Sequence, residues 1–175
     1  MSTICYELDI GSKRELMKKF PPKYPVAKYD HITIAMGGIG AKQPDPAETV
    51  EVVGVADDGN GIEVLIVHVN GSAMRPQDQK PWHITASFDP SKNAPASFDV
   101  FAKPGREKEK PYKPVTANGF LMNVLDDKGQ PKKVDNQNWK ITMFNEPISI
   151  TTHPKVQFDV MELNKITGMN LTKEF

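Results

Sequence analysis

The chain has 175 residues, with 22 basic and 22 acidic side chains, so its formal net charge at neutral pH is zero. A neutral chain has no bulk attraction for a polyanion, which argues against non-specific binding along nucleic acid through counterion release. The single cysteine, Cys5, excludes an internal disulfide and a metal centre built from several thiolates, and it favours a reducing compartment.

The length predicts one domain, residues 1–175, that buries roughly 70 % of the surface its unfolded chain exposes. Residues 1–10 carry Glu7 and Asp9 and lack a basic leader and an apolar core, so we expect no signal peptide. No apolar run approaches the length of a membrane span. We therefore expect a cytoplasmic protein that makes no membrane contact, and no feature of the sequence indicates a stable protein partner.

The first predicted elements are a strand and a short helix. Residues 3–10 alternate as a strand does, and their apolar positions share one face: Ile4, Tyr6, Leu8 and Ile10. Gly11 and Ser12 offer a turn and a helix N-cap for a basic helix over residues 13–20. Two prolines then end that helix, and residues 26–36 are predicted to form the next strand.

The central part of the chain predicts a hairpin and a further strand. Residues 49–56 and 62–69 are β-branched runs around an Asp-Asp-Gly-Asn-Gly turn, which is a strong hairpin signal. His68 lies in the second arm and is expected to be a structural or edge residue. Residues 71–81 form a polar loop that leads to a strand over residues 82–88.

The C-terminal half is predicted to be rich in strands, over residues 115–125, 139–144, 148–152 and 156–163, with a turn at 126–129 and His153 in a turn. Residues 96–102 are typical of a helical turn or a strand, and 164–175 of a short tail. Residues 103–114 are typical of a solvated mixed-charge loop or a basic lid over a phosphate cleft. The glycine-rich residues 37–40 favour a flexible loop over a nucleotide cradle, because no P-loop lysine follows them.

Two strands carry the same tripeptide, His31-Ile32-Thr33 and His83-Ile84-Thr85. Side chains two residues apart on a strand share a face and stand roughly 6.5 Å apart along it. Each copy therefore places an imidazole beside a hydroxyl, with isoleucine on the opposite face. We expect the two copies to meet at one cleft.

Two imidazoles and two hydroxyls in one cleft suit the cleavage of a phosphodiester. Near neutral pH one imidazole can remove a proton from a nucleophile while the other protonates a leaving oxygen. The threonine hydroxyls can donate hydrogen bonds to the phosphate oxygens. The sequence thus predicts His31 and His83 as acid and base and Thr33 and Thr85 as phosphate ligands, with no metal and no cofactor.

The paired His-Ile-Thr strands resemble the His-x-Thr/Ser motifs of the 2H phosphoesterase superfamily. Its members include RNA 2′,3′-cyclic phosphodiesterases of the LigT type, the cyclic phosphodiesterase domain of fungal tRNA ligase, 2′,5′-oligoadenylate phosphodiesterases and phage anti-CBASS nucleases. The resemblance implies a bilobal α+β fold, with antiparallel sheets, few short helices and a central cleft. It also implies that His31 and His83 act on a small nucleotide or oligonucleotide held by Thr33 and Thr85.

Other residues and functions follow from the same alternation. Tyr29 and Ser87 are predicted on the faces of the motif side chains, where Tyr29 either contacts a nucleoside or only lines the strand, and Trp82 is predicted on the apolar face. Two other functions stay open: a non-catalytic binding module or sponge for a phosphorylated nucleotide, and a zinc site built from His31, His83 and a carboxylate such as Asp30. The strand alternation argues against the zinc site, because it turns Asp30 away from His31.

Overall fold

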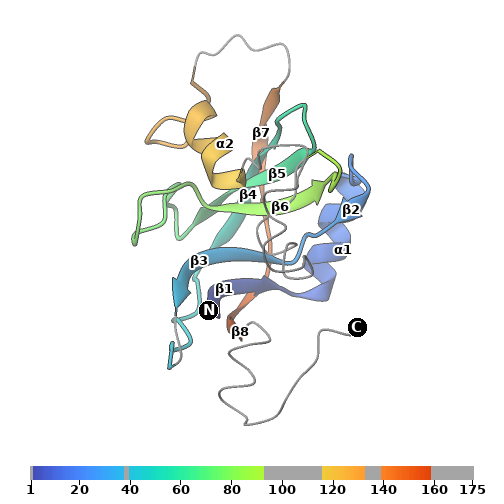
Figure 1. The fold of residues 1–175 in the computed structure, drawn as a ribbon. Helices are drawn as coiled ribbons and strands as arrows, with labels where there is room; N and C mark the ends of the chain where they lie inside the picture. The colour runs from blue at the N-terminus through green and yellow to red at the C-terminus, as the bar shows by residue number, and fades with distance from the viewer. Residues whose placement is uncertain (1, 38–39, 93–115, 133–138, 159–175) are drawn as a thin grey trace, which may run out of the picture.

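The computed structural model describes residues 2–37, 40–92, 116–132 and 139–158, and in these ranges one antiparallel sheet of eight strands is flanked by two helices (Figure 1). The strands run in the order β7-β4-β5-β6-β3-β1-β8, and β2 pairs with β6. The elements are β1 (Ser2–Leu8), α1 (Ile10–Lys19), β2 (Val26–Ala27), β3 (His31–Gly37), β4 (Val50–Asp57), β5 (Ile62–Val69), β6 (His83–Phe88), α2 (Ala117–Val124), β7 (Lys140–Ser149) and β8 (Thr152–Phe158).

The last two strands connect the two ends of the sheet. β7 pairs with β4 at one end and β8 pairs with β1 at the other, although only Ile150 and Thr151 separate the two strands. Ile150 donates its backbone N–H to Val50, and Thr151 accepts from the N–H of Asp9, each at 3.0 Å. A two-residue connection can join both ends only because the sheet is strongly curved, as Figure 1 shows.

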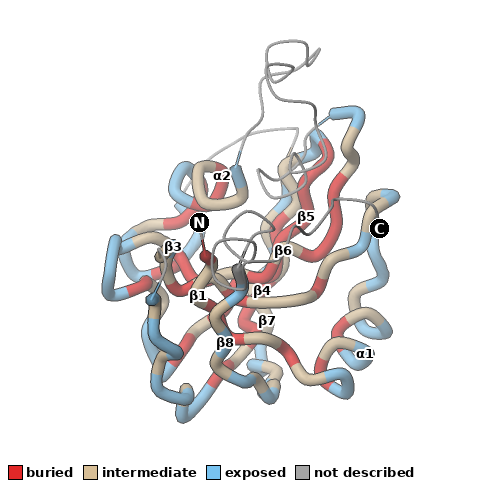
Figure 2. Tube along the Cα trace, turned by 60° about the horizontal axis from the view of Figure 1, so that its bottom comes forward, coloured by how far each residue is buried: buried red, intermediate tan, exposed pale blue. Residues whose placement is uncertain are grey.

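Each face of the sheet carries its own hydrophobic cluster. Along β5, Leu65 and Val67 belong to a cluster that includes Ile32, Ile84 and the α1 residue Leu16. The alternating residues Val64 and Ile66 belong to a second cluster, with Phe120, Leu121 and Val124 of α2. The two helices therefore cover opposite faces, and Figure 2 shows the buried positions following the strands while the helices turn exposed sides outward.

The helices begin where side chains cap them. Asp9 accepts a hydrogen bond from the N–H of Ser12 at 2.7 Å, so α1 begins at Ile10, before the predicted start at residue 13. Ile10 is consequently 67 % exposed rather than packed on the predicted strand face. Thr116 caps α2 in the same way, and the strand predicted over residues 115–125 is wrong.

Three further strand predictions need correction. The strand predicted over residues 26–36 is divided into β2 and β3, because Tyr29 adopts a left-handed backbone with φ of 50°. The segments 139–144 and 148–152 are largely one strand, β7, with an irregular register against β4. His153 lies within β8, opposite Glu7, and not in a turn.

The predicted fold class, α+β with an antiparallel sheet and few short helices, is confirmed for the described ranges, as is the hairpin of β4 and β5. None of the helices found there is long and apolar enough to cross a membrane. The predictions for residues 38–39, 96–102, 103–114 and 164–175, and for the last residues of 156–163, lie outside the described residues.

Candidate functional site

The two His-Ile-Thr segments pair with one another. β3 and β6 are antiparallel neighbours, and the residue pair in register between them is Ile32 with Ile84. Because the strands run in opposite directions, His31 lies on the Thr85 side of this pair and Thr33 on the His83 side. The two triplets are thus related by a local two-fold axis that passes between Ile32 and Ile84. The two histidines lie diagonally across the strand pair, as do the two threonines, and residues on such a diagonal are roughly 7–8 Å apart.

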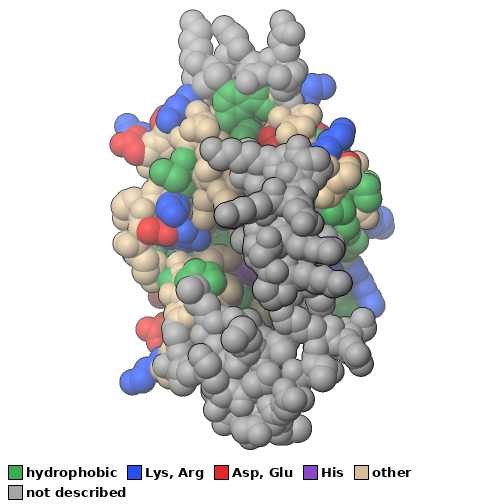
Figure 3. All heavy atoms as spheres, viewed as in Figure 1, with side chains coloured by type: hydrophobic (Ala, Val, Ile, Leu, Met, Phe, Trp, Pro, Cys, Tyr) green, Lys and Arg blue, Asp and Glu red, His purple; other side chains and the backbone are tan. Residues whose placement is uncertain are grey.

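All four polar side chains emerge on one face of the sheet. Ile32 and Ile84 are fully buried in the cluster beneath α1, whereas the histidines and threonines on either side of them are half-buried: His31, Thr33, His83 and Thr85. That face is the one on which α2 packs farther along the sheet. In the space-filling view, histidine surface is visible near the middle of the molecule (Figure 3).

His83 has one ring nitrogen occupied and its pKa strongly lowered. Its Nδ1 lies 3.1 Å from the carbonyl oxygen of Pro81, a contact that a neutral ring makes by carrying its proton on Nδ1. The pKa of His83 is lowered to about 4, mainly by burial; the Pro81 carbonyl opposes this lowering, and the charges of Arg75 and His31 contribute to it. At neutral pH the ring is therefore neutral, and its Nε2 carries the lone pair that can accept a proton.

We expect this imidazole to make the protein less stable in acid. The pKa of His83 is lower in the folded protein than the ordinary value of 6.5, so the unfolded chain binds the extra proton and stability falls as the pH drops from about 6.5 to about 4. The loss attributable to His83 at pH 4 is up to about 3 kcal/mol. Urea unfolding of the parent and of His83→Gln across this pH range measures it, and parallel curves for the two proteins contradict the expectation.

His31 lies among charges of both signs. Burial lowers its pKa most, the lysines Lys28 and Lys155 also lower it, and the carboxylates Asp30 and Glu7 raise it. Glu7 is the register partner of His31 on β1, and it accepts a hydrogen bond from Lys155 Nζ at 2.6 Å. Of the two rings, His31 is therefore the one that neighbouring carboxylates help to protonate.

A buried arginine supports the site from the loop before β6. The Arg75 guanidinium is bound to both carboxylate oxygens of Asp78, with Nε at 3.0 Å from Oδ1, and its Nη1 donates to the Thr33 carbonyl at 3.3 Å. Arg75 as a whole is 4 % exposed. The sequence predicts only a polar loop over residues 71–81. The signal that could have indicated an ordered ion pair there is the arginine and the aspartate three residues apart, Arg75 and Asp78.

Two predicted neighbours of the site are elsewhere. Tyr29 is fully buried in the cluster beneath α1, where its hydroxyl donates to the Phe20 carbonyl, so it is not available to a nucleoside. Ser87 is also fully buried and donates to Glu63 Oε1 at 2.7 Å, because the β5–β6 register shifts just before it. Trp82 is buried beside Tyr6, as the alternation predicts.

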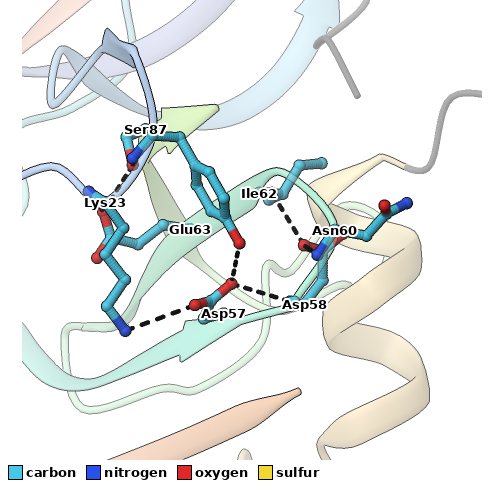
Figure 4. A network of polar contacts seen from close by, with 9 residues as sticks. Lys23, Asp57, Asp58, Asn60, Ile62, Glu63 and Ser87 are labelled. Atoms are coloured by element: carbon cyan, nitrogen blue, oxygen red, sulfur yellow. Dashed lines mark hydrogen bonds and ion pairs between the residues drawn. The ribbon is translucent and has the colours of Figure 1, made fainter. Parts of the chain in front are cut away.

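Glu63 and Ser87 belong to a separate structural network (Figure 4). The backbone N–H of Lys23 also donates to Glu63, and the N–H of Tyr24 donates to Ser87 Oγ. The Tyr24 hydroxyl donates to Asp57 Oδ1 at 2.6 Å. This network attaches the proline-rich segment after α1 to β4, β5 and β6, and it lies apart from the four polar residues of the site.

A hollow of about 180 Å³ adjoins the site beyond Pro81. It lies between the loop that carries Arg75 and the C-terminal end of α2, and its lining includes Met74, Gln79, Pro81, Met122, Leu125 and Asp127. Pro81 connects the two places, because its carbonyl is the partner of the His83 ring. Its walls are partly apolar, from Met122 and Leu125, and partly polar, from Gln79 and Asp127.

The described residues contain no group of three histidine, cysteine, aspartate or glutamate side chains placed to hold a metal ion. Asp30, the carboxylate considered for a zinc site, forms ion pairs with Lys13 at 2.9 Å and Lys28 at 3.4 Å. Cys5 is buried, and burial with the nearby Glu7 raises the pKa of its thiol to about 11, despite the opposing charge of Lys155. A thiol with that pKa is a poor nucleophile at neutral pH.

Comparison with protein-family models, with curated proteins and with solved structures found no match to this chain.

Proposed function

We propose that the protein is a metal-independent phosphodiesterase that cleaves a small nucleotide: a 2′,3′-cyclic phosphate, a cyclic oligonucleotide or a 2′,5′-linked oligonucleotide. We propose further that it is a member of the 2H phosphoesterase superfamily, with the two motif strands brought together as neighbours in one sheet. The observation that carries the proposal is the antiparallel pairing of the two His-Ile-Thr triplets about Ile32 and Ile84.

The pairing suits a phosphate held between the two rings. His31 and His83 are on a diagonal of the ladder, so a phosphorus atom between them has one ring on the side of the attacking oxygen and one on the side of the leaving oxygen. Thr33 and Thr85 occupy the other diagonal, from which their hydroxyls can donate to the non-bridging oxygens. Such preorganised donors act most strongly where water is partly excluded, and all four groups are half-buried.

The surroundings of the two rings favour His83 as the base and His31 as the acid. His83 has Nδ1 engaged with Pro81 and a low pKa, so its free Nε2 removes a proton from the attacking water or hydroxyl. Burial lowers the pKa of His31, but Glu7, Asp30 and a bound anionic substrate all oppose that lowering, so we assign His31 as the acid that gives its proton to the leaving oxygen. The phosphorus–oxygen bond to the leaving group breaks as the new bond forms, and proton transfer back between the rings through solvent restores the starting state.

A small substrate fits the rest of the molecule better than a long nucleic acid. The chain is neutral overall, so affinity for an extended polyanion has no general electrostatic source. The hollow lined by Pro81, whose carbonyl contacts the His83 ring, is where we propose that one planar group such as a nucleobase binds. We therefore place the scissile phosphate over β3 and β6 and an adjoining nucleoside toward α2.

The test is hydrolysis of a substrate panel in EDTA: 2′,3′-cyclic mononucleotides, 2′,5′-oligoadenylate, cyclic dinucleotides and cyclic trinucleotides. We expect turnover of at least one class, undiminished by the chelator, because the acid and base are side chains. A ligand that is retained by the protein but recovered unchanged by mass analysis supports the sponge in place of the enzyme. Activity that EDTA abolishes and zinc restores contradicts the two-histidine mechanism.

A further inference from the structure

We propose that Arg75 is a positioning residue of the histidine–threonine site, which it serves by holding the Thr33 carbonyl at the point where the pairing of β3 with β6 ends. The inference rests on the proposed function for its kinetic consequence, but its structural content concerns the free protein. Nothing in the His-x-Thr motif itself requires an arginine in the preceding loop.

The first argument is the incomplete ladder between the motif strands. β4 pairs with β5 over most of its length, and β1 with β3 likewise, whereas β3 and β6 share the single registered pair of Ile32 and Ile84. On the His31 side the ladder continues irregularly, because Tyr29 donates its N–H to the Thr85 carbonyl at 3.0 Å. On the Thr33 side the Arg75 guanidinium binds the Thr33 carbonyl.

The second argument is that the guanidinium is itself held in place. Asp78 binds it with both carboxylate oxygens, and a planar arginine fork bound this way has a defined orientation. The loop is tied together around the pair, since Arg75 donates its N–H to Lys80 and Gln79 donates to Arg75. A side chain that is almost fully buried and bonded on two sides can set the position of the third group that it contacts.

The third argument is the charge that Arg75 places beside His83. From the loop, the charge of Arg75, which is paired with Asp78, lowers the pKa of this ring, and from β3 the charge of His31 lowers it as well. The register partner on β5, Ile66, is apolar, and Asp127 belongs to the α2 end of the adjoining hollow. Arg75 thus acts on both halves of the site, on Thr33 through a hydrogen bond and on His83 through its charge.

Three variants separate these effects. Arg75→Met removes both the bond and the charge, Arg75→Lys keeps the charge but loses the planar fork, and Asp78→Asn keeps the arginine while removing its neutralising partner. Arg14→Met is the matched control, because Arg14 is exposed on α1. All are measured first without substrate, by NMR titration of the His83 ring and by the carbonyl ¹³C shift of Thr33.

We expect Arg75→Met to raise the pKa of His83 by about half a unit or more and to move the Thr33 carbonyl shift. Arg75→Lys should move the Thr33 shift while leaving the pKa of His83 near its parent value. Asp78→Asn should leave that pKa unchanged or lower. A rise in the pKa of His83 in all three variants indicates general loosening of the loop and overturns the proposal, as does a parent-like Thr33 shift in both Arg75 variants.

The kinetic arm uses whichever panel substrate is turned over. We expect kcat/KM to fall roughly 10- to 100-fold in Arg75→Met and Arg75→Lys, because small misplacements of a positioned group cost that much, and to stay at the parent value in Arg14→Met. Parent-like kinetics in both Arg75 variants overturn the proposal. If the parent cleaves none of the panel, the proposed function fails while the NMR arm still decides the role of Arg75. If Arg75→Met does not fold, the lysine and asparagine variants carry the comparison.

Discussion

Replacing either motif histidine by alanine is expected to lower kcat/KM for the cleaved nucleotide by at least roughly 100-fold, since a positioned acid or base contributes that much or more. The double variant should be little worse than the more damaging single one, because the two rings act on one phosphorus atom as a unit. Initial rates in EDTA at pH 7 measure this. The parent should show a bell-shaped pH–rate profile, and each single variant should lose one limb of it.

His68→Ala is the matched control for this experiment. His68 is also a strand histidine, half-buried on β5, but it has no hydroxyl two residues on, and its Nε2 has no hydrogen-bond partner among the residues that the structure describes. Its removal should leave the rate within about two-fold of the parent, given an unchanged melting temperature. If His31→Ala and His83→Ala cleave as fast as His68→Ala, the acid and base lie elsewhere.

The second large effect is expected for stability, at the centre of the site. Ile84 is fully buried and faces Ile32 across the motif strands, so Ile84→Ala should lower the free energy of unfolding by about 2–5 kcal/mol. Part of this cost is the lost transfer of the side chain from water, and part is the cavity left between the sheet and α1. Urea unfolding followed by far-UV circular dichroism measures it.

Ile84→Val is the conservative variant with which the stability loss of Ile84→Ala is compared. It removes one methylene group at the same place and should cost only about 0.5–1.5 kcal/mol. Thr85→Val, next along β6 but half-buried on the other face, should change stability much less than Ile84→Ala. Equal losses for Ile84→Ala and Thr85→Val contradict the assignment of the two faces.

The face on which the motif side chains lie could be predicted from the sequence because its signal is local. Alternation alone placed His83 and Thr85 on the face opposite Ile84, and the repeated tripeptide indicated that two such strands belong together. The sequence signal for the hairpin of β4 and β5 is also local, because the turn residues lie directly between the two β-branched runs. What the structure adds is the register that puts Ile32 opposite Ile84, which depends on tertiary pairing.

The errors have tertiary or capping causes. Ser87 does not share the face of His83 and Thr85, because a shift in the β5–β6 register precedes it. Tyr29 does not share the face of His31, because its backbone is left-handed. The strand expected over residues 115–125 is wrong because Thr116 caps a helix there, and a threonine in that position is a helix-start signal that the sequence does contain. Arg75 could not be placed at all, because its partner Thr33 is 42 positions away in the chain.

The placement of β1 between β3 and β8 has a consequence for how the chain acquires its structure. Ser2 is paired with Phe158, so one side of the first strand stays without a neighbour until nearly the whole described chain has left the ribosome. Loop-closure entropy makes so distant a pairing slow to form. Until β8 pairs with it, the unpaired edge of β1 is a surface on which nascent chains can associate. We expect truncation before β8 to give aggregated protein, and refolding of the full chain to be limited by the docking of its last strand.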